Sequence, residues 1–286
     1  MRVRSVLSCA AAAAAFAVLS HAPSASAQSI PLGNLFDDPA GTSLADAIAS
    51  DTYAEDAHVE DLGVDTVRVG GLDAASVAIA PGINFNFANV GGGGGSFTPI
   101  QNDSAYFTAV IRTTGTPMST NTQPGDIDNE EQGIGMHANA LITFDLDEIR
   151  AAGGLAGTPF TFTGEGGLND DTNANSSVRA IALVSDGTAV VAGYINGQQV
   201  AVAQDGNGNY VFTGTIPDEL TGVGNAPAFN VPLSATARFL TLATTSLDIN
   251  SDQAVFSMAQ LNVVPEPASL GLLALGSAML LRRRRA

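Results

Sequence analysis

Turn-forming residues interrupt the sequence from residue 83 to residue 264 at short and regular intervals, and this spacing restricts the fold more than any other feature. Glycine, asparagine and aspartate recur about every 8 to 12 residues, and the segments between them are rich in β-branched, aromatic and alternating apolar residues. Such segments suit short antiparallel strands. The chain is therefore predicted to be all-β, as an antiparallel sandwich. The predicted strands are 83–87, 105–111, 140–144, 160–162, 178–184, 189–195, 198–203, 210–213, 228–233, 239–243 and 254–264.

Three turn sequences connect neighbouring strands in the second half of the chain. Asp186-Gly187 and Asn196-Gly197 each separate two apolar runs, and both dipeptides suit two-residue hairpin turns of the primed types. The stretch from Asp205 to Gly208 predicts a longer hairpin tip. Residues 178–213 should therefore form an antiparallel meander of four strands. Helices are predicted only at 43–50 and at 147–152, the second ended by Gly153-Gly154.

The N-terminus has the three parts of a secretory signal. Met1 to Arg4 is basic, Val6 to Leu19 is almost unbroken apolar, and Ala25 and Ala27 are the small residues of a cleavage site. Cleavage is predicted after Ala27, which removes residues 1–27 as a signal peptide. A membrane-spanning anchor is the alternative, but the apolar run has 14 residues, whereas a span needs about 20.

The C-terminus has a second targeting segment. Pro265, Glu266 and Pro267 precede an apolar run, residues 268–281. The run is followed by a basic cluster formed by Arg282, Arg283, Arg284 and Arg285. In order, spacing and position, residues 263–286 resemble the PEP-CTERM sorting signal, which the membrane enzyme exosortase recognises and is thought to cut. The resemblance implies a short transmembrane helix at 268–281 whose flanking arginines stay on the cytoplasmic side. A simple tail anchor is the alternative.

The two targeting segments together predict where the protein is found. It should be exported through the inner membrane, held there transiently, and then lie at the cell surface or outside the cell. The predicted partners are the secretion machinery and exosortase. The 14-residue C-terminal helix would be about 21 Å long against a membrane core of about 30 Å, which suits a temporary hold better than a permanent anchor.

The composition of the remaining chain restricts both its stabilisation and its partners. Residues 28–262 are predicted to form one domain without a disulfide or a reactive thiol, because the only cysteine, Cys9, lies in the signal. From residue 28 to residue 267, five arginines and no lysine accompany 28 acidic residues, a formal charge of −23. This charge excludes nucleic acid as a partner. Solubility in a salty exterior is the preferred explanation, and divalent-cation binding is the alternative.

Three stretches of the body resemble the NPCBM family, carbohydrate-binding modules related to CBM51. They are residues 133–146 (GIGMHANALITFDL), residues 178–191 with their Asp-Gly turn, and residues 237–261 with the closing DQAVFSMAQL. The resemblance implies a galactose-binding-like, jelly-roll β-sandwich from about residue 132 onward, with a carbohydrate ligand. Phe256 stands where the family motif has tryptophan, and the chain has no tryptophan, the largest aromatic face for stacking on a sugar ring.

Three residues are candidate ligand contacts. His137 falls on the motif histidine of the resembled family, so its functional interpretation is a ligand hydrogen bond at the sandwich rim. Asp252 could supply an oxygen ligand, and Tyr194 could supply an aromatic face to a sugar. The preferred alternatives are structural: a histidine that fixes the start of a loop, a carboxylate that fastens a turn, and a tyrosine that covers an edge strand.

Calcium is the one inorganic ligand that the sequence leaves open. Asp205, Asn207 and Asn209 have the spacing that begins an EF-type loop. The sixth position is Tyr210 rather than glycine and the twelfth is Ile216 rather than glutamate, so a plain hairpin tip is the preferred interpretation. No cofactor is predicted.

The residues of known catalytic motifs are missing, so the chain is not predicted to be an enzyme. The sequence has no Gly-x-Ser-x-Gly elbow, and the exported part keeps only His58 and His137, too few for a tetrahedral zinc site. The preferred function is an exported surface or matrix protein with a non-catalytic, carbohydrate-binding-like sandwich, whose partner is extracellular polysaccharide. A purely structural or adhesive matrix protein is the alternative, and a glycoside-active enzyme is a more distant one.

Overall fold

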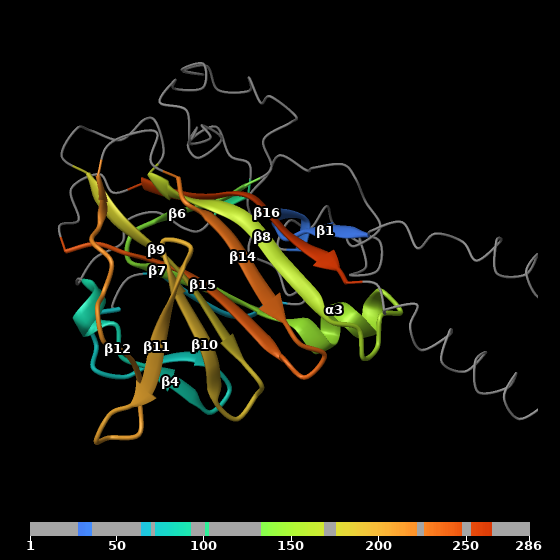
Figure 1. Cartoon of the computed structure of the whole chain (residues 1–286), viewed down its shortest axis with the longest axis horizontal. Helices are drawn as coiled ribbons and strands as arrows, with labels where there is room; N and C mark the ends of the chain where they lie inside the picture. Colours follow the sequence, from blue (N-terminus) through green and yellow to red (C-terminus); the bar gives the residue numbers. More distant parts are fainter. Residues whose placement is uncertain are drawn as a thin grey trace, which may run out of the picture.

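The computed structural model of the chain describes residues 28–35, 64–69, 72–92, 101–102, 133–168, 176–221, 226–247 and 253–264. These residues form β-strands in two sheets, accompanied by one α-helix and short 3-10 helices (Figure 1). The predicted all-β class is therefore confirmed. The signal, the sorting segment, the strand predicted at 105–111 and the helix predicted at 43–50 lie outside the described residues.

The first sheet is built around the C-terminal strand of the body, β16. Its strand order is β14-β8-β16-β6-β5, and β1 pairs with the end of β16. The strands are β1 (Ser29–Pro31), β5 (Gln101–Asn102), β6 (Gly133–His137), β8 (Phe160–Leu168), β14 (Ala228–Leu233) and β16 (Gln253–Val263). Since β8 and β6 both pair with β16 in antiparallel register, the strand that leads to the sorting segment is a central one.

The second sheet has the order β2-β7-β15-β9-β10-β11-β12-β4-β3, and β13 pairs with β9. Its first strands in the sequence are β2 (Val64–Val69), β3 (Val77–Ala80), β4 (Ile83–Phe85) and β7 (Ala140–Asp145). The others are β9 (Ser177–Ser185), β10 (Val190–Ile195), β11 (Gln198–Gln204), β12 (Tyr210–Thr213), β13 (Leu220–Thr221) and β15 (Phe239–Thr245). The helices are η1 (Gly33–Leu35), η2 (Ala88–Val90) and α3 (Leu146–Ala152).

The four-stranded meander predicted for residues 178–213 is confirmed as β9-β10-β11-β12. The turn between β10 and β11 is the predicted two-residue type, because Asn196 and Gly197 both have positive φ, 51° and 73°, as a type I′ turn requires. A Cβ on Gly197 would lie 2.2 Å from the carbonyl oxygen of Ala228. Glycine is therefore needed at this position both for its φ and for the close approach of β14.

The hairpin between β9 and β10 is confirmed, but the predicted two-residue turn at Asp186-Gly187 is wrong. The strands are in register again only at Ser185 and Val190, so four residues form the loop. The carboxylate of Asp186 explains the longer turn: its Oδ1 accepts hydrogen bonds from the Thr188 N–H, the Thr188 hydroxyl and the Ala189 N–H, each at 2.8 Å. A side chain thus replaces a main-chain acceptor in the turn.

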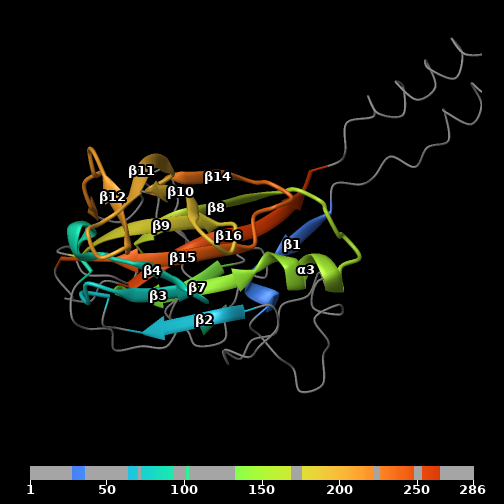
Figure 2. The ribbon, with the colours of Figure 1, turned by 90° about the horizontal axis from the view of Figure 1, so that it is seen from below.

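Two hydrophobic cores lie on the two faces of the second sheet. The main core fills the space between the sheets, where Phe162 and Phe256 of the first sheet meet Phe144 and Leu242 of the second. The other core lies where β3, β4 and η2 cover β7, β9 and β15 (Figure 2). Every residue of β15 is buried, since side chains alternate between two buried faces.

The two ends of the body leave the sandwich together, at the α3 end (Figure 1). The Val263 N–H donates to the carbonyl of Gln28 at 2.9 Å, and the Val264 N–H donates to the carbonyl of Pro159 at 3.1 Å. In the antiparallel pair of β6 and β16, His137 lies opposite Gln253, ten residues before Val263. His137 therefore lies at the end of the sandwich opposite to α3.

Candidate functional site

The end of the sandwich away from α3 gathers polar side chains from several strands. The strand register shows that β7 and β9 begin where β15 finishes, because Thr244 lies opposite both Ala140 and Ala180, and Thr245 lies opposite Arg179. The side chains that form this end, called the rim below, are His137, Asn139, Ser177, Arg179, Glu219, Ser246 and Leu247.

The carboxylate of Glu219 organises the rim. Its Oε1 accepts hydrogen bonds from Arg179 Nη1 at 3.0 Å and from the main-chain N–H of Leu247 at 2.8 Å. Its Oε2 accepts a hydrogen bond from the Ser177 hydroxyl at 2.6 Å. One side chain therefore holds together the start of β9, the segment before β13 and the segment after β15.

The guanidinium of Arg179 is held rigidly beside this carboxylate. Nε donates to the carbonyl of Pro217 at 2.9 Å, and Nη1 donates to the carbonyl of Val90 at 3.0 Å as well as to Glu219. The paired side chains of Arg179 and Glu219 keep 11% and 13% of their surface exposed. Nη2 has no acceptor among the described residues, so one edge of a fixed guanidinium carries N–H donors that the fold does not use.

Gly91 forms the floor below the ion pair. It follows η2 in a left-handed conformation with φ 82°. A Cβ at this position would lie 3.0 Å from Leu247 Cγ and 3.2 Å from Arg179 Nη1. The glycine therefore lets an apolar side chain and a guanidinium come together over the backbone. Leu247 itself is 72% exposed.

Asn139 joins the two sheets at the rim. Its side chain is fully buried, and its Oδ1 accepts a hydrogen bond from the Ser246 N–H at 3.0 Å. Its Nδ2 has no partner among the described residues. Buried amide groups in proteins are normally paired, so this donor is unusual within the described fold.

The three candidate ligand residues from the sequence are placed differently. His137 ends β6 at the rim, largely buried, with Nδ1 2.6 Å from the carbonyl oxygen of Ala138, so this ring nitrogen donates to the loop. Asp252 lies outside the described residues, next in sequence to Gln253, which is in register with His137. Tyr194 lies on β10 in the main core, where burial raises the pKa of its hydroxyl. The structure therefore brings His137 to the rim and places Tyr194 in the core.

The candidate calcium residues lie at the tip of the hairpin between β11 and β12. The Oδ1 atom of Asp205 accepts the main-chain N–H groups of Asn207 at 2.8 Å and of Asn209 at 3.0 Å. The side-chain amide of Asn209 donates to the carbonyl of Ala75 at 3.2 Å. The hydrogen bonds that Asp205 accepts, from the Asn207 N–H first and then from Asn209, lower the pKa of its carboxyl. Across the described part of the chain, no group of three or more His, Cys, Asp or Glu side chains is arranged to hold a metal ion.

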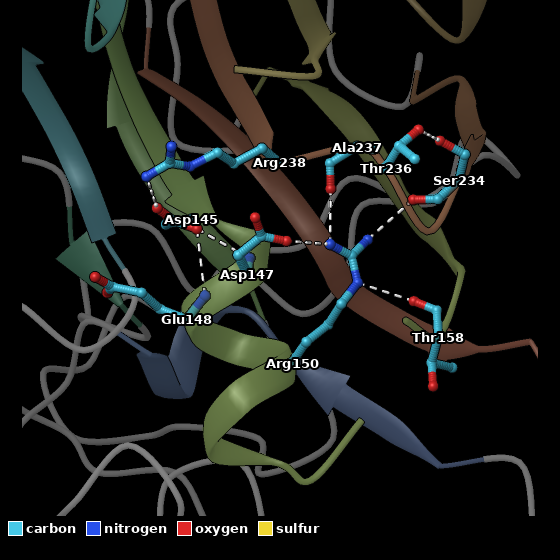
Figure 3. Close-up of polar contacts among 9 residues, drawn as sticks. All are labelled: Asp145, Asp147, Glu148, Arg150, Thr158, Ser234, Thr236, Ala237 and Arg238. Carbon is cyan, nitrogen blue, oxygen red and sulfur yellow. Dashed lines mark hydrogen bonds and ion pairs between the residues drawn. The ribbon is translucent and has the colours of Figure 1, made fainter. Parts of the chain in front are cut away.

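A second polar cluster, at the α3 end, is structural (Figure 3). The buried guanidinium of Arg150 donates from Nε to the carbonyl of Thr158 at 2.9 Å, and from Nη1 and Nη2 to the carbonyls of Ala237 and Ser234 at 2.8 and 3.0 Å. Asp147 Oδ1 also accepts a hydrogen bond from Arg150 Nη1, at 2.9 Å. Burial lowers the pKa of Arg150, while Asp147 acts in the opposite direction. The guanidinium is enclosed by its acceptors, unlike that of Arg179.

The rim contains residues that the sequence analysis did not single out. Arg179 is one of five arginines in the body, and it stands inside an otherwise apolar strand, which was a usable signal. The sequence around Glu219 and Leu247 has no such signal. Their neighbours in space come from β9 and η2, and a local sequence pattern does not indicate contacts between distant segments.

The C-terminal residues 263–285 match the PEP-CTERM protein-sorting motif. The predicted sorting signal is therefore confirmed, and it implies export, C-terminal sorting and processing by exosortase. The predicted transmembrane helix lies outside the described residues; within the described ranges no helix is long and apolar enough to cross a membrane. No curated protein matches the chain.

Three solved structures similar to the chain contain CBM51 modules. One holds the catalytic domain and two CBM51 domains of ZmpB from Clostridium perfringens, at 17% identity over 70% of this chain and 14% of that one, with a TM-score of 0.32. Another holds a CBM51 domain of ZmpB with GlcNAc, at 15% identity over 76% and 36%, with a TM-score of 0.34. A third holds tandem CBM51 modules of a family 98 glycoside hydrolase from Streptococcus pneumoniae, at 16% identity over 59% and 42%, with a TM-score of 0.36. The chain thus spans less than half the length of each of these chains.

Proposed function

We propose that the protein is an exosortase-sorted component of the cell surface or extracellular matrix, and that its β-sandwich binds polysaccharide without catalysis. The observation that carries the proposal is the PEP-CTERM motif at residues 263–285, which follows directly on the last strand of the body. A PEP-CTERM motif serves export and sorting. The body of an exported protein acts outside the inner membrane.

The position of the rim supports this function. Gln28 and Val264 leave the body at the α3 end, where the main chains of Gln28 and Val263 are hydrogen-bonded at 2.9 Å. A body held by its sorting segment would therefore turn the α3 end toward the membrane and the rim away from it. The rim, with Arg179, Glu219 and Leu247, is then the end that meets material outside the cell.

The non-catalytic part of the proposal rests on residue chemistry. The exported body contains no cysteine, which removes thiol nucleophiles. At the rim, the carboxylate of Glu219 already accepts three hydrogen bonds and faces an arginine, so its oxygens hold neighbouring segments together.

A purely structural or adhesive matrix protein is the second candidate. The lack of tryptophan in the chain and the burial of Tyr194 in the core favour it, because the named rim residues include no phenyl, phenol or indole ring for a sugar to stack on. In that case the sandwich would act through its shape and charge alone.

Binding to polysaccharides distinguishes the two candidates. The full chain, purified from membranes in detergent, is incubated with insoluble polysaccharides and applied to an array of neutral and acidic glycans, with calcium and with chelator. Retention on at least one glycan supports the proposed function, and loss of retention with chelator would assign a role to calcium. Failure to bind any glycan in either condition would support the adhesive alternative.

A further inference from the structure

We infer that the Arg179–Glu219 pair and the exposed side chain of Leu247 form a binding site for a neutral, hydroxyl-rich ligand, such as an uncharged polysaccharide. This inference rests on the proposed function and specifies its site and ligand class. It depends on three properties of the rim: unused polar atoms, an apolar surface beside them, and a rigid support.

The polar atoms match a pair of adjacent hydroxyl groups. Arg179 Nη2 carries two N–H donors with no acceptor among the described residues, and a guanidinium has no acceptor of its own. Glu219 Oε2 accepts one described hydrogen bond, from Ser177, and a carboxylate oxygen can accept about two. A donor and an acceptor on two paired side chains complement a vicinal diol, since each hydroxyl both donates and accepts.

The apolar surface lies over the same glycine as the guanidinium. Among the described residues, the large apolar side chains that stay exposed are Val191, Leu247, Met258 and Val264. Leu247 is the most exposed of them, and it is the one that shares the Gly91 floor with Arg179. Its main-chain N–H is fixed by Glu219 at 2.8 Å. A sugar ring has an apolar C–H face as well as hydroxyl edges, and the rim offers a counterpart to both.

Charge selects the class of ligand. The ion pair carries no net charge, whereas the stretch from residue 28 to residue 267 has a formal charge of −23. A polyanion approaching this body would be repelled over a distance of about one Debye length, about 8 Å in physiological salt. A neutral polyol meets no such barrier, so uncharged glycans are favoured over acidic ones.

The support of the site lowers the entropic penalty of binding. Arg179 is held by the carbonyls of Pro217 and Val90 and by Glu219, all within 3.0 Å. The Thr245 hydroxyl donates to the same Val90 carbonyl at 2.7 Å. Groups that are already ordered before binding lose little freedom when the ligand arrives.

Three single variants test the inference in the full chain. Leu247→Ser removes the apolar surface from an exposed side chain, and Arg179→Lys keeps the charge but removes the Nη2 donors. Val191→Ser is the matched control, because Val191 is 55% exposed and lies on β10 near the α3 end. Binding to the neutral and acidic glycans of the array is measured together with the midpoint of thermal unfolding.

We expect Leu247→Ser and Arg179→Lys each to weaken binding to a neutral glycan about tenfold. The unfolding midpoint of Leu247→Ser should be that of the unmodified chain, and Val191→Ser should bind as the unmodified chain does. Unchanged binding in Leu247→Ser would overturn this site while the proposed function stands. Tighter binding to acidic than to neutral glycans would overturn the ligand class. No binding by the unmodified chain to any glycan would overturn the inference and the proposed function together.

Discussion

The side-chain oxygen of Asn196 accepts a hydrogen bond from the main-chain N–H of Ala180 at 2.9 Å. The Asn196 N–H donates back to the Ala180 carbonyl at 2.8 Å, and Nδ2 donates to the carbonyl of Asp218 at 2.9 Å. This buried turn residue thus ties the β10–β11 hairpin to β9 and to the residue before Glu219, so it supports the rim from below.

Replacing Asn196 by alanine should destabilise the protein by about 2 to 3 kcal/mol. The variant loses one buried and one partly buried hydrogen bond, to the Ala180 N–H and the Asp218 carbonyl. It also forces a residue with a Cβ and no polar group to keep φ at 51°. Denaturant unfolding monitored by circular dichroism measures the effect. Asn207→Ala, at an exposed hairpin tip, is the control and should change stability by less than about 0.5 kcal/mol.

Replacing Arg150 by methionine should destabilise the protein by about 3 kcal/mol. The variant removes the donor to the carbonyl of Ala237 in a buried bond and to those of Thr158 and Ser234 in partly buried ones, and the Ser234 carbonyl keeps the Ala237 N–H as a donor. Arg238→Met is the comparison, because that side chain is 48% exposed and forms a single ion pair with Asp145 at 3.3 Å. Arg238→Met should lower the free energy of unfolding by about 1 kcal/mol or less. Equal losses in denaturant unfolding would contradict the structural role assigned to Arg150.

Acid should weaken the β9–β10 hairpin through Asp186. Hydrogen bonds from Thr188, from its N–H first, and from Ala189 lower the pKa of the Asp186 carboxyl below its ordinary value. A lowered pKa in the folded state means that the contribution to stability is present above the ordinary pKa of about 4 and is lost as the pH falls through the folded value. The free energy of unfolding should therefore fall less between about pH 5 and about pH 2 in Asp186→Asn than in the unmodified chain. Parallel pH profiles of the two proteins would contradict this assignment.

Processing at the C-terminus should depend on Glu266. In cells with a matching exosortase, the mature protein is expected to lack residues 268–286, and Glu266→Ala should leave the precursor in the membrane, because it removes the only charge of the Pro-Glu-Pro segment. Intact-mass measurement of the membrane and exported fractions checks this. An exported, unmodified protein that still carries Arg282 to Arg285 would show that the segment is not processed.

The sequence predicted the parts of the fold that depend on neighbours along the chain. The Asn196-Gly197 turn was identified because its φ requirements are local, and the helix at 147–152 was predicted together with its glycine stop. The structure extends that helix to Leu146–Ala152 and shows Asp145 as its N-cap. The prediction of a two-residue turn at Asp186-Gly187 was wrong, because the Asp186 side chain accepts three hydrogen bonds that such a turn does not make.

The rim could not be predicted in the same way. Arg179 and Glu219 are 40 residues apart, and Leu247 reaches them only because β15 pairs with β9. Strand order, not periodicity, decides such contacts. His137 was found from a local motif and does lie at the rim, whereas the core position of Tyr194 follows from where β10 lies relative to the first sheet.

The central place of β16 also has a mechanical consequence. β16 is the last strand before the sorting segment, and it is paired with β8, β6 and β1. Tension between a tether at Val264 and material held at the opposite end would run along this strand, so its inter-strand hydrogen bonds would be loaded together in shear instead of being peeled apart one by one. An edge strand under the same pull would share the load with one neighbour, whereas β16 shares it with β8 on one side and β6 on the other.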